Sequence, residues 1–135
     1  MNPQEMSVVS SGEGRLHVRV TEEFKVSEAS RLLEEVRRCA EAAGAKEVLI
    51  DLRDYTRKFT VIQRLQMAVA VVAKLRGFRM AAVFSENSFD PQRLGQTMAN
   101  NRGGNVATFT DLAEAEAWLM AARRASEEAN WAKPV

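Results

Sequence analysis

The residues best suited to chemistry lie in one segment, VLIDLRDYTRKFTVIQRL, residues 48–65. An apolar run ends there in an aspartate, and a basic, aromatic loop leads into a helical repeat. Ligands of open α/β sheets bind outside the carboxyl ends of the strands, which makes this loop a candidate site. Its candidate residues are Asp51, Asp54, Tyr55, Arg57, Lys58 and Thr60.

Further polar residues follow the next two apolar runs and belong at the same edge of a parallel sheet. They are Ser85, Glu86 and Asn87 after the first, with Thr108 and Thr110 at the second. We expect this set to contact a partner or a ligand, with Ser85 and Asn87 as its main candidates. The alternative is that these residues only form turns and cap helices, which loops require in any protein.

Asp51 could act as a base, as a metal ligand, or as an acceptor for backbone N–H groups of the following loop. The last role is the commonest. A metal site needs convergent carboxylates or histidines, and the only histidine, His17, lies on another strand. The single cysteine, Cys39, falls on the apolar stripe of a helix. We therefore expect no metal, no cofactor and no catalytic residue.

Motifs of the common enzyme classes are absent from the sequence. It contains no G-x-S-x-G, H-E-x-x-H, C-x-x-C or G-x-x-x-x-G-K-[ST]. Gly103 and Gly104 follow a helix and so read as a terminating turn instead of a phosphate-binding loop. We expect a protein that is not an enzyme.

Length and composition fit one ordinary globular domain. The chain has 135 residues, of which 46% are hydrophobic and 27% charged. A net charge of +1 disfavours nucleic-acid binding. The single cysteine and an N-terminus without the residue order of a signal peptide favour a cytoplasmic location. No apolar run is long enough to span a membrane.

Periodicity predicts nine elements in the order β-β-α-β-α-β-α-β-α. The strands are expected at 6–10, 15–20, 47–53, 79–85 and 106–109. The helices are expected at 29–43 after a Ser27 cap, at 60–76 after a Thr60 cap, from Asp90-Pro91 to NNRGGN, and at 112–122 after Asp111. This order predicts an α/β fold, a single mixed sheet in which an N-terminal hairpin precedes parallel β-α units, with flanking helices. We expect a domain over 1–124, with 125–135 as a helical extension or loose tail.

Two features leave alternatives open. Arg15, His17 and Arg19 share one face of a strand and form either an anion-binding strip or a solvated face. The helix at 60–76 is apolar around much of its circumference. It is therefore either central in the domain or in contact with a second subunit, which predicts a homodimer. Trp131, near the end of the chain, would need a docking surface.

Three stretches resemble the SpoIIAA-like family, relatives of the STAS domains of anti-sigma-factor antagonists, and more loosely the CRAL-TRIO lipid-transfer domains. They are EVLIDLRDY (47–55), FRMAAVF (78–84) and VATFTDLAEAEAWL (106–119). The resemblance implies a SpoIIAA/STAS-like fold. In the STAS antagonists a D-S-x-G serine at the start of the second helix is phosphorylated. Here the segment reads RKFTVIQRL, and Thr60 is the nearest hydroxyl and the only candidate phosphoacceptor.

These observations favour a non-enzymatic protein-interaction module, or a regulatory or ligand-sensing module, acting as a dimer or with a protein partner. The loop at 54–60 and the start of the following helix are its expected contact surface. The alternative is a carrier for a small apolar or anionic, lipid-like ligand held between helices near the strand ends.

Overall fold

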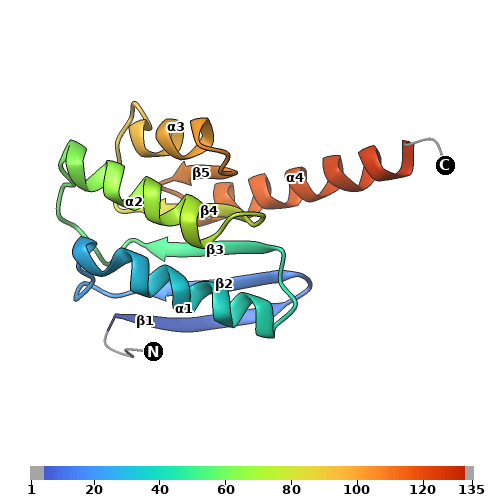
Figure 1. The fold of residues 1–135 in the computed structure, drawn as a ribbon, viewed down its shortest axis with the longest axis horizontal. Helices are drawn as coiled ribbons and strands as arrows, with labels where there is room; N and C mark the ends of the chain where they lie inside the picture. Colours follow the sequence, from blue (N-terminus) through green and yellow to red (C-terminus); the bar gives the residue numbers. More distant parts are fainter. Residues whose placement is uncertain (1–4, 133–135) are drawn as a thin grey trace.

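A computed structural model of the chain describes the backbone of residues 5–132 and the side chains of residues 5–129. One five-stranded sheet lies between two layers of helices (Figure 1). The strands are β1 (Met6–Gly12), β2 (Arg15–Val20), β3 (Glu47–Leu52), β4 (Arg79–Phe84) and β5 (Val106–Phe109). The helices are α1 (Ala29–Ala42), α2 (Val61–Lys74), α3 (Leu94–Asn101) and α4 (Leu112–Ala132), with a 3-10 turn at Val26–Glu28 before α1.

The strands lie in the order β1-β2-β3-β4-β5. β1 and β2 form an antiparallel hairpin, and every later neighbour pairs in parallel. The hairpin turns through Glu13 and Gly14, which both have positive φ, 54° and 81°. Two such residues give the turn whose twist suits a two-residue hairpin. The mixed sheet and the order of elements are as predicted from the sequence.

Alternate residues of the central strand β3 face two separate apolar layers. Val48 and Ile50 pack beneath α1, α2 and α3, whereas Leu49 packs with Ala115 and Leu119 of α4. All six residues of β3 are buried, as expected for a parallel strand covered on both faces. Asp51 has the parity of Leu49 and therefore belongs to the α4 side of the sheet.

Two helix starts differ from the prediction. Ser27 does not cap α1, because it lies inside the 3-10 turn that buried Val26 anchors, and α1 begins at Ala29 without a side-chain cap. Asp90-Pro91 forms a turn and α3 begins only at Leu94. The Asp90 carboxylate accepts the N–H groups of Gln92 at 3.0 Å and Leu94 at 2.8 Å, and this local bonding competes with helix geometry.

Helix α4 continues to Ala132 and projects from the domain at its C-terminal end (Figure 1). The N-terminal part of α4 packs on the sheet through Leu119, and Arg123 bonds to the buried carboxylate of Glu47. Arg15 and Arg79 also pair with Glu47, at 2.9 and 3.3 Å. Residues 125–132 are therefore a helical extension, while the side chain of Trp131 and residues 133–135 lie outside the described residues.

Candidate functional site

The loop that follows β3 is held in place first by Asp51. Its Oδ1 accepts the backbone N–H and Nε of Arg53, both at 3.0 Å, and Oδ2 accepts Nη2 at 2.9 Å. Burial raises the pKa of Asp51, but the Arg53 bonds outweigh it, and the carboxyl pKa lies below its ordinary value. The expected role of Asp51 as an acceptor for a backbone N–H group of the loop is confirmed. The same carboxylate is paired with the Arg53 guanidinium.

The arginines of β2 are also paired within the chain. Arg19 makes a bidentate contact with Asp54 at 2.8 and 2.9 Å, and Arg15 pairs with Glu47. His17 between them is half-buried, and its Nε2 is buried without a hydrogen-bond partner. The strip predicted as a possible anion site therefore has both of its guanidinium groups occupied by carboxylates of the same chain.

Tyr55 was expected on the contact surface of this loop, but it is buried. Its side chain is only 5% exposed. The ring stacks on Phe59 with 4.7 Å between centroids and meets the edge of Phe24 at 5.7 Å. The sequence alone did not reveal this burial, because Phe24 is distant along the chain. Tyr55 belongs to the core and cannot serve as a surface contact.

Ser85 and Asn87 hold the same loop from the neighbouring strand end. The Ser85 hydroxyl donates to the carbonyl of Tyr55 at 3.0 Å, and the Asn87 amide donates to the carbonyl of Thr56. Ser88, which is buried, bonds to Ser85 at 2.9 Å. The structure thus brings Ser85 and Asn87 to the loop as predicted, with its backbone carbonyls as their partners.

Thr60 ends the loop and begins α2. Its Oγ1 accepts the Gln63 N–H at 3.1 Å, and the Gln63 side chain accepts the Thr60 N–H at 2.9 Å. This reciprocal pair is a capping box, so the predicted cap is confirmed. Arg57 and Lys58 before it are exposed, and the Arg57 guanidinium lies 4.9 Å from the centre of the Tyr55 ring.

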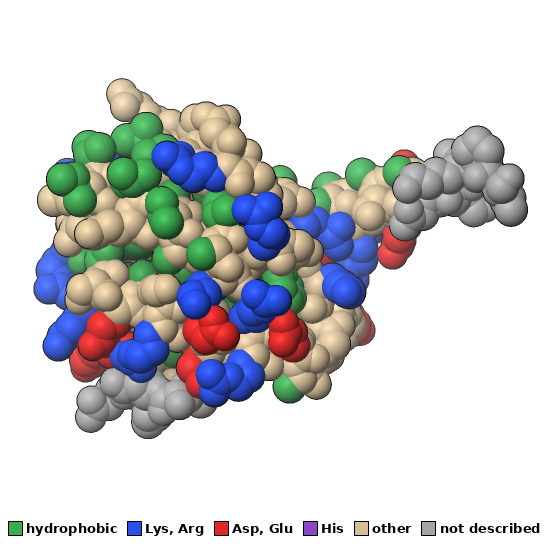
Figure 2. Space-filling model, in the orientation of Figure 1, with side chains coloured by type: hydrophobic (Ala, Val, Ile, Leu, Met, Phe, Trp, Pro, Cys, Tyr) green, Lys and Arg blue, Asp and Glu red, His purple; other side chains and the backbone are tan. Residues whose placement is uncertain are grey.

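Helix α2 carries an exposed apolar face made of Val61, Ile62, Leu65 and Val69, which we call the α2 face. Ile62 is 68% exposed. Figure 2 shows hydrophobic side chains gathered near the left end of α2 with basic side chains beside them. The alternative in which this helix is central in the domain is therefore wrong, since only Ala68, Ala70, Val71 and Val72 are buried. The other alternative, contact with a second subunit, stays a prediction.

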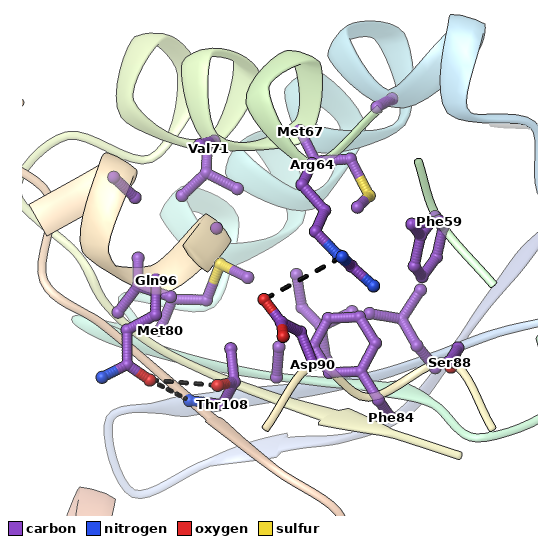
Figure 3. A pocket seen from close by; sticks show the side chains of 18 of the residues that line it. Phe59, Arg64, Met67, Val71, Met80, Phe84, Ser88, Asp90, Gln96 and Thr108 are labelled. Carbon is purple, nitrogen blue, oxygen red and sulfur yellow. Dashed lines mark hydrogen bonds and ion pairs between the residues drawn. The ribbon is translucent and has the colours of Figure 1, made fainter. Parts of the chain in front are cut away.

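A pocket lies on the opposite side of α2, between α2, α3 and the sheet (Figure 3). Its volume is about 110 Å³. Apolar side chains form most of its wall, including Phe59, Met67, Val71, Met80 and Phe84.

Polar groups also line this pocket. Arg64 extends from α2 toward Asp90, with 3.9 Å between guanidinium and carboxylate (Figure 3). Gln96 Oε1 accepts the Thr108 N–H at 2.9 Å and hydroxyl at 3.0 Å. The pKa of Asp90 lies below its ordinary value, chiefly because its carboxylate accepts the Leu94 N–H.

Arg64 and Gln96 were missed as candidates by reasoning from the sequence. A signal for Arg64 was present, because it precedes buried Ala68 by four residues and Val71 by seven. Residues at this spacing share one side of a helix, and a cation there must have a reason to face inward. Gln96 gave no such signal, since its bond to Thr108 depends on the packing of α3 on β5.

Two observations concern other kinds of site. Within the described part of the chain, no three His, Cys, Asp or Glu side chains come together in a way that could hold a metal ion. Among residues 5–132, no helix combines the length and apolar character needed to cross a membrane.

Comparison with known proteins identifies the family. The model of the SpoIIAA-like family matches residues 15–120, from the start of β2 to the packed part of α4. No curated protein matches the chain. The matched segment contains the loop, the α2 face and the pocket. The family match does not support the alternative role as a carrier. The chain belongs to the SpoIIAA-like family.

Proposed function

We propose that this chain is a non-enzymatic, cytoplasmic regulatory module that binds a protein partner through the α2 face. The observation that carries the proposal is the exposure of Val61, Ile62, Leu65 and Val69 side by side on one helix. Contiguous exposed apolar side chains on a folded domain commonly mark an interaction surface. The regulatory role is supported by membership of the SpoIIAA-like family.

The charges around the α2 face favour an acidic partner. Residues 57–76 contain five Lys or Arg residues and no Asp or Glu. Lys74 is paired with Glu34 at 3.1 Å, whereas Arg57 and Lys58 at the N-terminal end of α2 have no carboxylate partner among the described residues. Two copies meeting through this face would bring like charges together, so the predicted homodimer is a less favourable occupant than an acidic protein.

The family resemblance also fits this placement. In the STAS antagonists the phosphorylated serine begins the second helix, and Thr60 occupies the corresponding position beside the α2 face. We propose that the loop at 54–60 contributes to partner contact through Arg57 and Lys58, because its other candidate side chains are engaged within the domain.

The test replaces two apolar side chains of the α2 face by polar ones, Ile62→Gln with Leu65→Gln. The matched control is Met120→Gln, which changes another exposed apolar side chain on α4. Affinity capture from the native host, quantified by mass spectrometry, should show partners that are lost with the double variant and kept with the control. Stability should change by no more than about 0.5 kcal/mol, because the replaced side chains are exposed.

Size-exclusion chromatography with light scattering separates the two kinds of occupant. A monomeric purified chain that captures a partner supports the acidic protein, and a dimer dissociated by the double variant supports self-association through the α2 face. Identical capture and identical mass for the wild type, the double variant and the control would remove the α2 face from the proposal.

A further inference from the structure

The pocket beneath α2 carries an inference beyond the proposed function, since its occupancy does not require a protein partner. It is half open and is lined by α1, α2, α3 and by residues of β3, β4 and β5 (Figure 3). Phe59, Met67, Met80 and Phe84 give it apolar walls. Such a space loses dispersion contacts when empty and gains them from an apolar occupant.

The volume limits what can enter. At about 110 Å³, the space is smaller than the pockets of roughly 300–1,000 Å³ that hold drug-sized ligands. It is closer to an apolar cavity of about 150 Å³, which is large enough for benzene. One six-membered ring or a short branched chain matches this volume, whereas a long acyl chain would have to extend out of the pocket into solvent.

The charged residues that line the pocket indicate the sign of the ligand's charge. The Arg64 side chain is only 20% exposed, and its 3.9 Å separation from Asp90 exceeds hydrogen-bond distance. No hydrogen bond to the Arg64 guanidinium is found among the described residues. The Asp90 carboxylate is instead engaged by the N–H groups of Gln92 and Leu94. The donors of Arg64 are therefore available to another acceptor.

A second arginine, Arg93, also lines the pocket, with its guanidinium 5.5 Å from the centre of the Phe89 ring. Its backbone is left-handed, with φ of 52°, which is uncommon for a residue other than glycine. The charged lining residues are Arg64, Arg93 and Asp90, so the lining carries a net positive charge despite that carboxylate. Guanidinium groups bind carboxylates through paired, charge-assisted hydrogen bonds.

We infer that this pocket binds a small apolar carboxylic acid, with its hydrocarbon body between Met67, Met80 and Phe84 and its carboxylate on Arg64. This class of ligand is narrower than the small lipid-like ligand of the alternative hypothesis, because the volume of the pocket matches a ring or a short chain. Arg64 would fix the orientation of the ligand, and the apolar wall would supply most of its burial.

The experiment uses three probes on the full chain: benzoate, its neutral isostere benzamide, and the long-chain acid decanoate. Binding is followed by two-dimensional NMR titration and by thermal unfolding. Benzoate should shift the amides of α3 and of the first turns of α2, and raise the unfolding temperature. Benzamide should bind about tenfold more weakly, because it cannot pair ionically with Arg64.

Variants then test the assigned residue. Arg64→Met should weaken benzoate binding about tenfold while affecting benzamide little. Lys46→Met, which removes an exposed cation outside the pocket, should leave both unchanged. The inference is overturned by the absence of saturable benzoate binding, by equal affinity for benzoate and benzamide, or by decanoate binding as tightly as benzoate. The probe comparison on the wild-type chain stands even if Arg64→Met fails to fold.

Discussion

Charged side chains next to β3 are satisfied mainly within the chain. Asp51 holds Arg53, Asp54 holds Arg19, and Glu47 is surrounded by three arginines. These contacts fix the loop after β3 and leave few free charges in it. A sequence motif that looks rich in chemistry is therefore largely structural, and the groups that remain for binding are Arg57, Lys58 and, at the pocket, Arg64.

His17 predicts a dependence of stability on pH. Burial is the main cause that lowers its pKa, with Arg15 and Arg53 acting in the same direction and Asp51 and Glu116 opposing them. The unfolded chain therefore binds a proton more readily than the folded one as pH falls below the ordinary value of 6.5. The free energy of unfolding should fall in this window as pH decreases.

The measurement is urea unfolding at pH 5.0, 6.0 and 7.0, with His17→Gln as comparison. The chain has one histidine, so this substitution should remove the contribution of His17 to the slope. Asp51 does not interfere, because its pKa lies below its ordinary 3.8 and its contribution is lost only at more acidic pH. Burial raises the pKa of Glu5 above its ordinary 4.5, which adds a slope of opposite sign to both proteins. Equal changes in stability between pH 5 and 7 for the wild type and His17→Gln would contradict the assignment.

Which residue roles the sequence could predict depends on how local their partners are. Thr60 and Asp51 were assigned correctly because their partners lie two or three residues away. Tyr55 was not, because its burial depends on Phe24, which a helix and a strand separate from it. Arg64 required knowledge of how α2 sits over the sheet and α3.

At the scale of elements, α2 serves both proposed sites from different sides. Ile62 and Leu65 are exposed, whereas Arg64, Met67 and Val71 line the pocket. The apolar pattern of this helix could be read from the sequence, but the pattern alone does not say which apolar side is covered. Tertiary packing decides it, since α2 lies between α1 and α3 over the sheet and only its outward face stays exposed (Figure 1).

The capping box predicts how strongly the start of α2 depends on Thr60. Thr60→Ala removes the acceptor for the Gln63 N–H and should lower the free energy of unfolding by about 1 kcal/mol. Thr60→Ser keeps the hydroxyl and should remain near wild type. Chemical denaturation of the three proteins measures the difference, and equal stabilities would show that the cap contributes nothing.

The same position tests the phosphoacceptor hypothesis. A negative group on Thr60 would lie at a helix N-terminus, where it is favourable, and close to Arg57 and Lys58. Thr60→Glu should therefore alter partner capture, while Thr60→Ala should capture partners as the wild type does once stability is matched. Unchanged capture by Thr60→Glu would count against a switch at this position.

At the scale of the whole molecule, the sequence was sufficient for the architecture because its elements are regularly spaced and connected by short loops. Strand pairing follows from the β-α-β order, and the hairpin follows from its turn. The sequence was less informative about α4, whose packed and projecting parts have similar composition. What separates them is Leu119 on the sheet and Arg123 on Glu47, and both are contacts with distant strands.

Truncation after Arg124 tests whether residues 1–124 fold as a unit. The side chains of Arg124 to Ala129 are exposed, and the last side chain that anchors α4 to the sheet, among those described, is Arg123. The shortened chain should therefore unfold within about 0.5 kcal/mol of the full chain in urea, with an unchanged m-value.

Arg123→Ala in the full chain sets the scale for this comparison, since it leaves Glu47, only 1% exposed, with two of its three guanidinium partners. That substitution should destabilise the protein, because it weakens compensation of a buried charge. A truncated chain as unstable as Arg123→Ala would mean that the projecting turns are needed to hold Arg123 in its helix. A still larger loss would show that residues 125–135 contribute packing of their own, and the boundary at 124 would be wrong.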